Sequence, residues 1–198
     1  MKISDYYTHM TIMESLKDYA SPDAKLTTMI QSGEVIRIRR GLYLSGNSAS
    51  FSLKTLANMI YGPSYISFEY ALSYYNLIPE RVSLVTSASF RKNKSRNYNT
   101  PVGNFLYRSI SEHAFAYEVQ LLYDNEHPFL MATPEKALCD TLSKFSFSDQ
   151  KELVDFLFQH MRIDEEELYT IDAQTVDFLA PLYSSKSVGQ FAEYLKRT

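Results

Sequence analysis

The chain has 198 residues, 45% of them hydrophobic and 22% charged, which is a globular composition and excludes a disordered chain. A single cysteine, Cys139, excludes an internal disulfide and a cysteine-based zinc site, and the four histidines lack metal-ligand spacing. The polar start and the lack of any run of about 18 apolar residues exclude a signal peptide and a spanning helix. We therefore expect a cytoplasmic protein with no membrane partner, no metal and no cofactor.

The charges are unevenly distributed, although the net charge is only −3. Residues 81–108 carry six bases and no acid, whereas residues 149–172 carry eight acids against two bases. Such polarity fits a protein with one face toward a polyanion and another toward a different partner. The alternative is two solvated faces that only keep the protein soluble.

A helical pattern opens the chain. Apolar spacing predicts a helix over residues 12–19, with Thr11 as its N-cap and Glu14 completing a capping box. Ser21 and Pro22 then begin a second helix, and Gly33 is a natural residue to end it.

After Gly33 the spacing of the apolar residues changes from helical to alternating, and a basic hairpin follows. Arg37 and Arg39 alternate with apolar residues, and Arg40-Gly41 predicts the turn of a β-hairpin that continues to Leu44. Helix, turn, helix and basic hairpin is the order of a winged helix-turn-helix. We expect this DNA-binding domain to span residues 1–47, with the Ser/Gly/Asn-rich stretch 45–48 as its boundary.

The remaining residues, 48–198, predict a larger mixed α+β domain that ends in helices, so the fold class is α+β. Its expected helices lie at 51–61, 67–75, from Thr133 onward (Thr N-cap, then Pro134 and Glu135), 149–161, 164–170 and 187–197. Its expected strands lie at 64–66, 82–86, 119–123 and 128–131, with one or two more over 100–110, broken by Pro101 and Gly103. The basic segment 91–96 is expected in a loop or hairpin tip.

Three sets of residues are candidates for contacts with DNA. The second helix of such a pair enters the major groove, where Lys, Gln and Thr side chains read base edges. Wing arginines grip the backbone or minor groove. The candidates are Lys25, Thr27, Thr28 and Gln31 on the helix, Arg37, Arg39 and Arg40 on the wing, and Arg91, Lys92, Lys94 and Arg96 in the basic segment.

Two observations keep other interpretations open. Residues 1–60 carry seven bases and five acids, so tight DNA binding would need a dimer or a second contact surface. A winged-helix scaffold that contacts proteins instead is the alternative, and the tyrosines at 70, 74 and 75 would fit a partner surface. The basic segment 91–96 could equally be a solvated tip.

Enzymatic signals are weak. The sequence has no glycine-rich phosphate loop, no nucleophile elbow and no metal-ligand spacing, and a nucleotidyltransferase would need a Gly-Ser plus paired-aspartate pattern that is missing. Cys139 falls in an apolar helix, which favours a buried structural thiol over a nucleophile. We expect no catalytic residues.

Four segments, in order, resemble the AbiEi-type antitoxins, bacterial transcriptional regulators of type IV toxin–antitoxin and abortive-infection systems. They are the wing at 33–43, the segment Tyr65-Ile66-Ser67 through Pro79, the strands at 85–87 and 100–105, and Ala132-Thr133-Pro134-Glu135-Lys136-Ala137-Leu138-Cys139-Asp140. The resemblance covers about residues 10–145, and nothing specific is recognised after them.

The resemblance implies a non-enzymatic antitoxin. The N-terminal winged helix of the family binds inverted repeats in the operon's own promoter, and the C-terminal part opposes a nucleotidyltransferase-like toxin. The outward residues of the second helix and the wing arginines become the DNA contacts. The first of the usual three helices would be shortened to about Ile3–Thr8. We expect a monomer or weak dimer in solution.

Overall fold

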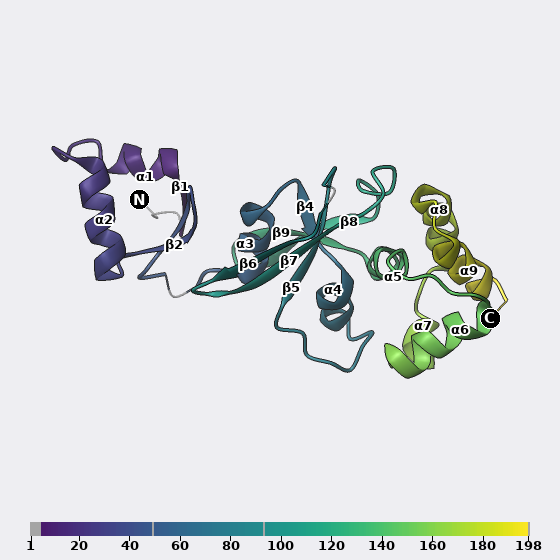
Figure 1. Ribbon diagram of the computed structural model, residues 1–198. Coiled ribbons are helices and arrows are strands. Elements are labelled where there is room, and N and C mark those ends of the chain that lie inside the picture. The colour runs from purple at the N-terminus through teal and green to yellow at the C-terminus, as the bar shows by residue number, and fades with distance from the viewer. Residues whose placement is uncertain (1–4, 49, 93, 198) are drawn as a thin grey trace.

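The computed structural model describes residues 5–48, 50–92 and 94–197 and is mixed α+β, as predicted (Figure 1). A small N-terminal unit lies at one end, a six-stranded sheet occupies the middle, and helices form the C-terminal end. In this described part of the chain, none of the helices combines the length and apolar character needed to cross a membrane.

The N-terminal unit contains two helices and a three-stranded antiparallel sheet of order β1-β3-β2. Its elements are β1 (Tyr6–Thr8), α1 (His9–Ser15), α2 (Pro22–Ser32), β2 (Val35–Arg39) and β3 (Leu42–Ser45). α2 begins and ends where predicted, with Pro22 at its first position. It ends there because Gly33 takes the left-handed conformation (φ 79°) that glycine adopts at low cost after a helix. The predicted turn at Arg40-Gly41 is also confirmed.

The start of the chain differs from the prediction. The first helix covers residues 9–15 rather than 12–19, because the Thr8 hydroxyl, not that of Thr11, caps it by accepting the Thr11 N–H at 3.2 Å. The shortened helix expected over Ile3–Thr8 is wrong for residues 6–8, which form β1 and pair with β3; Ile3 and Ser4 lie outside the described residues.

A β-bulge separates the two arginines of strand β2. Arg37 pairs with Tyr43, but the register then shifts, so that Arg39 lies opposite Leu42. Because directly paired residues of an antiparallel sheet point to the same face, Arg37 shares the face of Tyr43 and Arg39 shares that of Leu42. The bulge therefore sends two arginines that are two residues apart to opposite faces of the small sheet.

Both faces of this small sheet are covered. Tyr43 and Val35 pack with Ile12, Leu16 and Leu26 of the two N-terminal helices. On the opposite face, Ile38, Leu42 and Leu44 belong to the main hydrophobic core, which continues through the rest of the chain. The Tyr6 hydroxyl also accepts the Ser52 N–H at 2.7 Å. The small sheet thus joins the N-terminal helices to the rest of the protein.

The central sheet has the strand order β6-β7-β5-β4-β9-β8. Its elements and the helices between them are α3 (Leu53–Ile60), β4 (Ser64–Ile66), α4 (Phe68–Tyr74), β5 (Val85–Ser89), β6 (Arg96–Thr100), β7 (Gly103–Ser109), β8 (Val119–Asp124) and β9 (His127–Ala132). β7 lies between β5 and β6, parallel to the first and antiparallel to the second. Of the one or two strands predicted over 100–110, one is present as β7; Pro101 lies in the turn of the β6–β7 hairpin, and β6 begins earlier, at Arg96.

Helix α3 supplies hydrogen bonds where the sheet separates. Among the described residues, β4 pairs with β5 along all three of its residues but with β9 only at Ile66 and Met131. The Thr55 hydroxyl donates to the Pro128 carbonyl at 2.9 Å, and the Asn58 amide oxygen accepts the Leu130 N–H at 2.6 Å. Side chains of α3 thus satisfy backbone groups of β9 that lack a strand partner.

The C-terminal helices are α5 (Pro134–Leu142), α6 (Gln150–Asp155), α7 (Glu165–Leu168), α8 (Ala173–Tyr183) and α9 (Lys186–Leu195). A π-helical turn, η1 (Phe156–His160), continues α6. The predicted start of α5 is confirmed, since the Thr133 hydroxyl accepts the Lys136 N–H at 3.3 Å. α8 was not predicted: Pro181 breaks the helical pattern in the sequence but falls in the last turn of this helix.

A buried ion pair lies inside this end of the protein. The Lys136 Nζ lies 3.2 Å from the Asp140 carboxylate, one turn along α5, and both side chains are completely buried. Asp140 also accepts hydrogen bonds from Tyr65, Ser67 and Tyr183, at 3.0, 2.6 and 2.5 Å. The network joins α5 to β4, to the residue before α4 and to α8.

Gly46 makes a close backbone approach that allows no side chain. A Cβ at this position would lie 1.7 Å from the Gly33 carbonyl oxygen, and the Gly46 N–H donates to the Glu34 carbonyl at 2.8 Å. We expect Gly46→Ala to lower the free energy of unfolding by about 1–3 kcal/mol, because backbone atoms must move. Urea denaturation followed by circular dichroism measures this loss.

Gly189→Ala is the matched control. Gly189 lies inside α9, and a Cβ there would meet nothing within 4 Å in the described part of the chain. Alanine at an interior helix position is favoured over glycine by about 0.5–1 kcal/mol. Equal unfolding free energies for the two variants would contradict the close approach at Gly46.

Candidate nucleic-acid interface

A groove of about 390 Å³ separates α2 from the β2–β3 hairpin. It brings together Thr27 of the helix and Arg37 and Arg40 of the hairpin, three of the residues predicted to contact DNA. Its lining also contains His9, Asp23, Leu26, Ile30, Gly41 and Tyr43. The groove therefore offers two guanidinium groups beside a helix face of mixed polar and apolar residues, with the Asp23 carboxylate among them.

The outer face of α2 is polar. Thr27, Thr28 and Gln31 are exposed, whereas Lys25 is half-buried, with its ammonium 5.3 Å from the centre of the Tyr19 ring. The hydroxyls of Thr27 and Thr28 donate to the backbone carbonyls four residues earlier. Each hydroxyl oxygen can still accept a hydrogen bond, and each threonine methyl suits an apolar contact such as a thymine methyl.

The three wing arginines do not share one surface. Arg37 and Arg40 line the groove, but the bulge turns Arg39 toward the rest of the protein. Its guanidinium donates to the Arg40 carbonyl at 3.0 Å and to the Met59 carbonyl of α3 at 3.4 Å. In this position Arg39 joins the hairpin to the C-terminal end of α3.

The described residues of the predicted basic segment lie between β5 and β6, past the end of β7 and not at a hairpin tip, and Arg96 is already the first residue of β6. Arg91 pairs with Glu112 at 2.7 Å, and the Lys92 ammonium lies 5.1 Å from the centre of the Tyr61 ring. Lys94 and Arg96 are exposed, and the latter begins the edge strand β6. Lys94 and Arg96 are therefore the residues of this segment best placed for a second contact.

A tyrosine cluster lies beside the wing and the basic segment. The Tyr61 ring lies 5.3 Å from that of Tyr107 and 5.9 Å from that of Tyr98. The Tyr107 hydroxyl donates to the Ala57 carbonyl at 2.6 Å, and burial raises the pKa of Tyr107, an effect that the positive charge of Arg39 opposes. The side chains of Arg39 and Lys92 thus both lie at the C-terminal end of α3.

Cys139 is buried in α5, and burial raises the pKa of its thiol, so the thiol stays protonated. Within residues 5–48, 50–92 and 94–197, no group of three His, Cys, Asp or Glu side chains could hold a metal ion.

Comparison with known protein families gives no matching family, and no curated protein matches the chain. The resemblance to AbiEi-type antitoxins therefore stays a prediction.

Of the tyrosines predicted for a partner surface, Tyr74 is exposed, but the Tyr75 hydroxyl donates to the Ala132 carbonyl at 2.9 Å. Burial and the neighbouring Tyr74 raise the pKa of Tyr75 to about 12.

Proposed function

We propose that the protein is a DNA-binding transcriptional regulator whose N-terminal unit acts as a winged helix-turn-helix. In this proposal α1 and α2 form the helix pair, and the β2–β3 hairpin is the wing. The observation that carries it is the groove in which Thr27 of α2 meets Arg37 and Arg40 of the hairpin. A helix in the major groove and a basic hairpin on the adjacent backbone would contact DNA through these two walls.

A single N-terminal unit is weakly charged for this role. Residues 5–47 carry five bases and five acids. Since each neutralised phosphate contributes to affinity through counterion release, we propose that a second copy on an inverted repeat, or Lys94 and Arg96, adds contacts. A monomer or weak dimer in solution would then bind tightly only to a paired site.

The resemblance extends the proposal to an antitoxin. Residues 48–198 would oppose a nucleotidyltransferase-like toxin in the cytoplasm, and the N-terminal unit would repress the promoter of the shared operon. The charge separation along the chain supports two faces with different partners, since residues 149–172 are acidic.

Binding of the full-length protein to its own upstream DNA tests the proposal. We expect at least about a thousandfold preference over a scrambled duplex of equal length, which is the lower end for specific DNA-binding proteins. The logarithm of the affinity should fall steeply with the logarithm of the salt concentration. Equal affinity for the two duplexes at every salt concentration would overturn the regulator proposal.

The second candidate is a protein-interaction module that keeps this scaffold without binding DNA. The equal number of acids and bases in residues 5–47, with Asp23 beside the two groove arginines, favours it. This candidate predicts that no duplex, including the upstream region, binds in a salt-dependent manner.

A further inference from the structure

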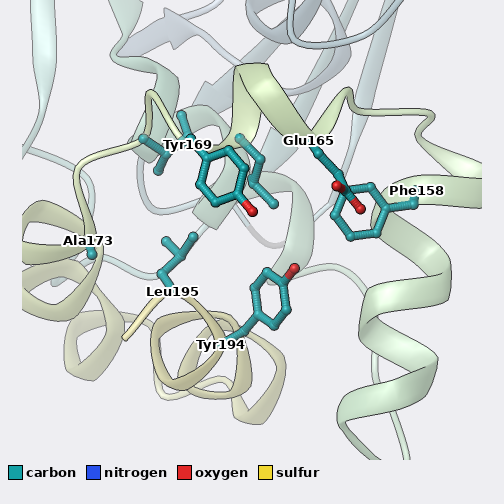
Figure 2. Close-up of a pocket in the computed structure, with 8 residues that line it drawn as sticks. Phe158, Glu165, Tyr169, Ala173, Tyr194 and Leu195 are labelled. Carbon is teal, nitrogen blue, oxygen red and sulfur yellow. The ribbon is translucent and has the colours of Figure 1, made fainter. Parts of the chain in front are cut away.

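A pocket of about 250 Å³ opens between the C-terminal helices, far along the chain from the proposed DNA interface (Figure 2). Its residues come from η1, α7, the start of α8 and the end of α9: Phe158, Glu165, Leu168, Tyr169, Ile171, Ala173, Tyr194 and Leu195. The volume is below the range of about 300–1,000 Å³ that is usual for small-molecule sites. It suits one long side chain better than a cofactor.

Three aromatic rings and one carboxylate give the pocket its chemistry. The rings of Phe158, Tyr169 and Tyr194 line it, and Glu165 supplies the acid. Figure 2 shows the hydroxyls of Tyr169 and Tyr194 turned toward the middle of the pocket. Burial raises the pKa of Tyr194, and the Glu165 carboxylate raises it further, which places this carboxylate within electrostatic reach of the ring.

Among the described residues, no cation forms a salt bridge with the Glu165 carboxylate. In the part of the chain that the structure describes, the bases of this region are engaged elsewhere or distant: Arg162 pairs with Glu80, and no Lys, Arg or His lies within salt-bridge distance of Glu165. Glu165 also lies among seven further acids in residues 149–172. The resulting field attracts cations to the pocket.

We infer that this pocket receives a basic side chain, best an arginine, from a protein partner. Aromatic faces attract a cation through their π-electrons, and a planar guanidinium can stack on a ring while it donates to a carboxylate and to phenol oxygens. Tyr169 and Glu165 are exposed, so a side chain inserted from a partner can reach them, and the acids around the pocket complement a basic partner surface. Occupation of this pocket would not require DNA binding.

An NMR titration of the full-length chain with N-acetyl-arginine-N-methylamide tests the site. We expect saturable shifts of the backbone amides of Tyr169, Tyr194 and their pocket neighbours, with a dissociation constant in the millimolar range. The citrulline analogue has the same shape without the charge and should give no saturable shifts. Equal shifts from both probes, or arginine-induced shifts scattered over all acidic helices, would overturn the inference.

Two variants distinguish binding in the pocket from general electrostatic attraction by the surrounding acids. Glu165→Gln is expected to weaken arginine binding about tenfold, the effect of one charge-assisted hydrogen bond. Glu166→Gln is the matched control: it removes the same charge from the next residue of α7, outside the pocket lining, and should change affinity by less than about twofold at moderate salt. Equal losses in the two variants would mean that only the field attracts the probe.

Sedimentation of the unmodified protein and of Glu165→Gln tests whether a second copy of this chain fills the pocket instead. We expect any rise of the protein's mass with concentration to be the same in Glu165→Gln as in the unmodified protein. Self-association that Glu165→Gln abolishes would identify the second copy as the occupant and overturn the assignment to a different protein.

Discussion

Asp140→Asn is expected to lower the free energy of unfolding by about 3–5 kcal/mol, the cost of leaving a buried charge without its partner. The Lys136 ammonium would stay fully buried beside a neutral amide. Its remaining hydrogen bonds, to the Ala114 carbonyl at 2.8 Å and the Tyr183 hydroxyl at 2.5 Å, compensate an ammonium only in part. Urea denaturation followed by circular dichroism measures the loss.

The structure offers controls for this change. Glu193→Gln alters the same charge on an exposed position of α9 and should cost less than about 0.5 kcal/mol. The double variant Lys136→Met with Asp140→Leu removes both charges, and we expect it to be more stable than Asp140→Asn alone. A loss below about 1 kcal/mol for Asp140→Asn would show that Lys136 finds water or another partner when its carboxylate is removed.

Replacing both Arg37 and Arg40 with alanine is expected to weaken binding to the upstream DNA about a hundredfold, about tenfold for each charge-assisted contact. If each arginine neutralises one phosphate, the slope of log affinity against log salt should become less steep by about 0.9 per arginine. Fluorescence anisotropy with a labelled duplex, repeated across a salt series, gives both quantities.

Arg39→Ala is the matched control, because it removes the same charge from the same strand. Its guanidinium donates to the Arg40 and Met59 carbonyls, so we expect the salt slope to stay nearly unchanged. Gln31→Ala should instead change the preferred base at one position and leave the slope unaltered. A loss of slope in Arg39→Ala as large as that in Arg40→Ala would place Arg39 on DNA as well.

Local signals in the sequence predicted the helices with clear ends. Pro22 at the first helical position and Gly33 after the last one identified α2, and Thr133 with Pro134 identified the start of α5. These residues act through their own backbone angles and hydrogen bonds within a few residues. Such signals need no knowledge of the rest of the fold.

Long-range pairing explains most of what the sequence did not show. β1 is three residues long and is held by β3, more than thirty residues later, so its own residues carry little strand signal. The bulge at Arg39 depends on register against β3 in the same way. For α8, Asp172 accepts the N–H groups of Gln174 and Thr175, a local capping signal in the sequence that the prediction did not use.

In the candidate site too, local signals identified some residues, and contacts between distant segments decided the positions of others. Polar residues of α2 and basic residues of the hairpin could be chosen by type and spacing, and Thr27, Arg37 and Arg40 do line one groove. The separate position of Arg39 and the pairing of Arg91 with Glu112 depend on contacts between distant segments. Neither could be read from the alternation of charges along the chain.

The small sheet has a consequence for how the protein can be divided. Tyr43 and Leu44 are neighbours in β3, yet one belongs to the core of the N-terminal helices and the other to the core of the remaining protein. A graft of residues 1–47 onto another scaffold would expose Ile38, Leu42 and Leu44 to water. Although the Ser45–Ser48 stretch follows the last strand of the small sheet, we expect the N-terminal unit to be less stable alone than in the whole chain, because α3 and the main core cover one face of its hairpin.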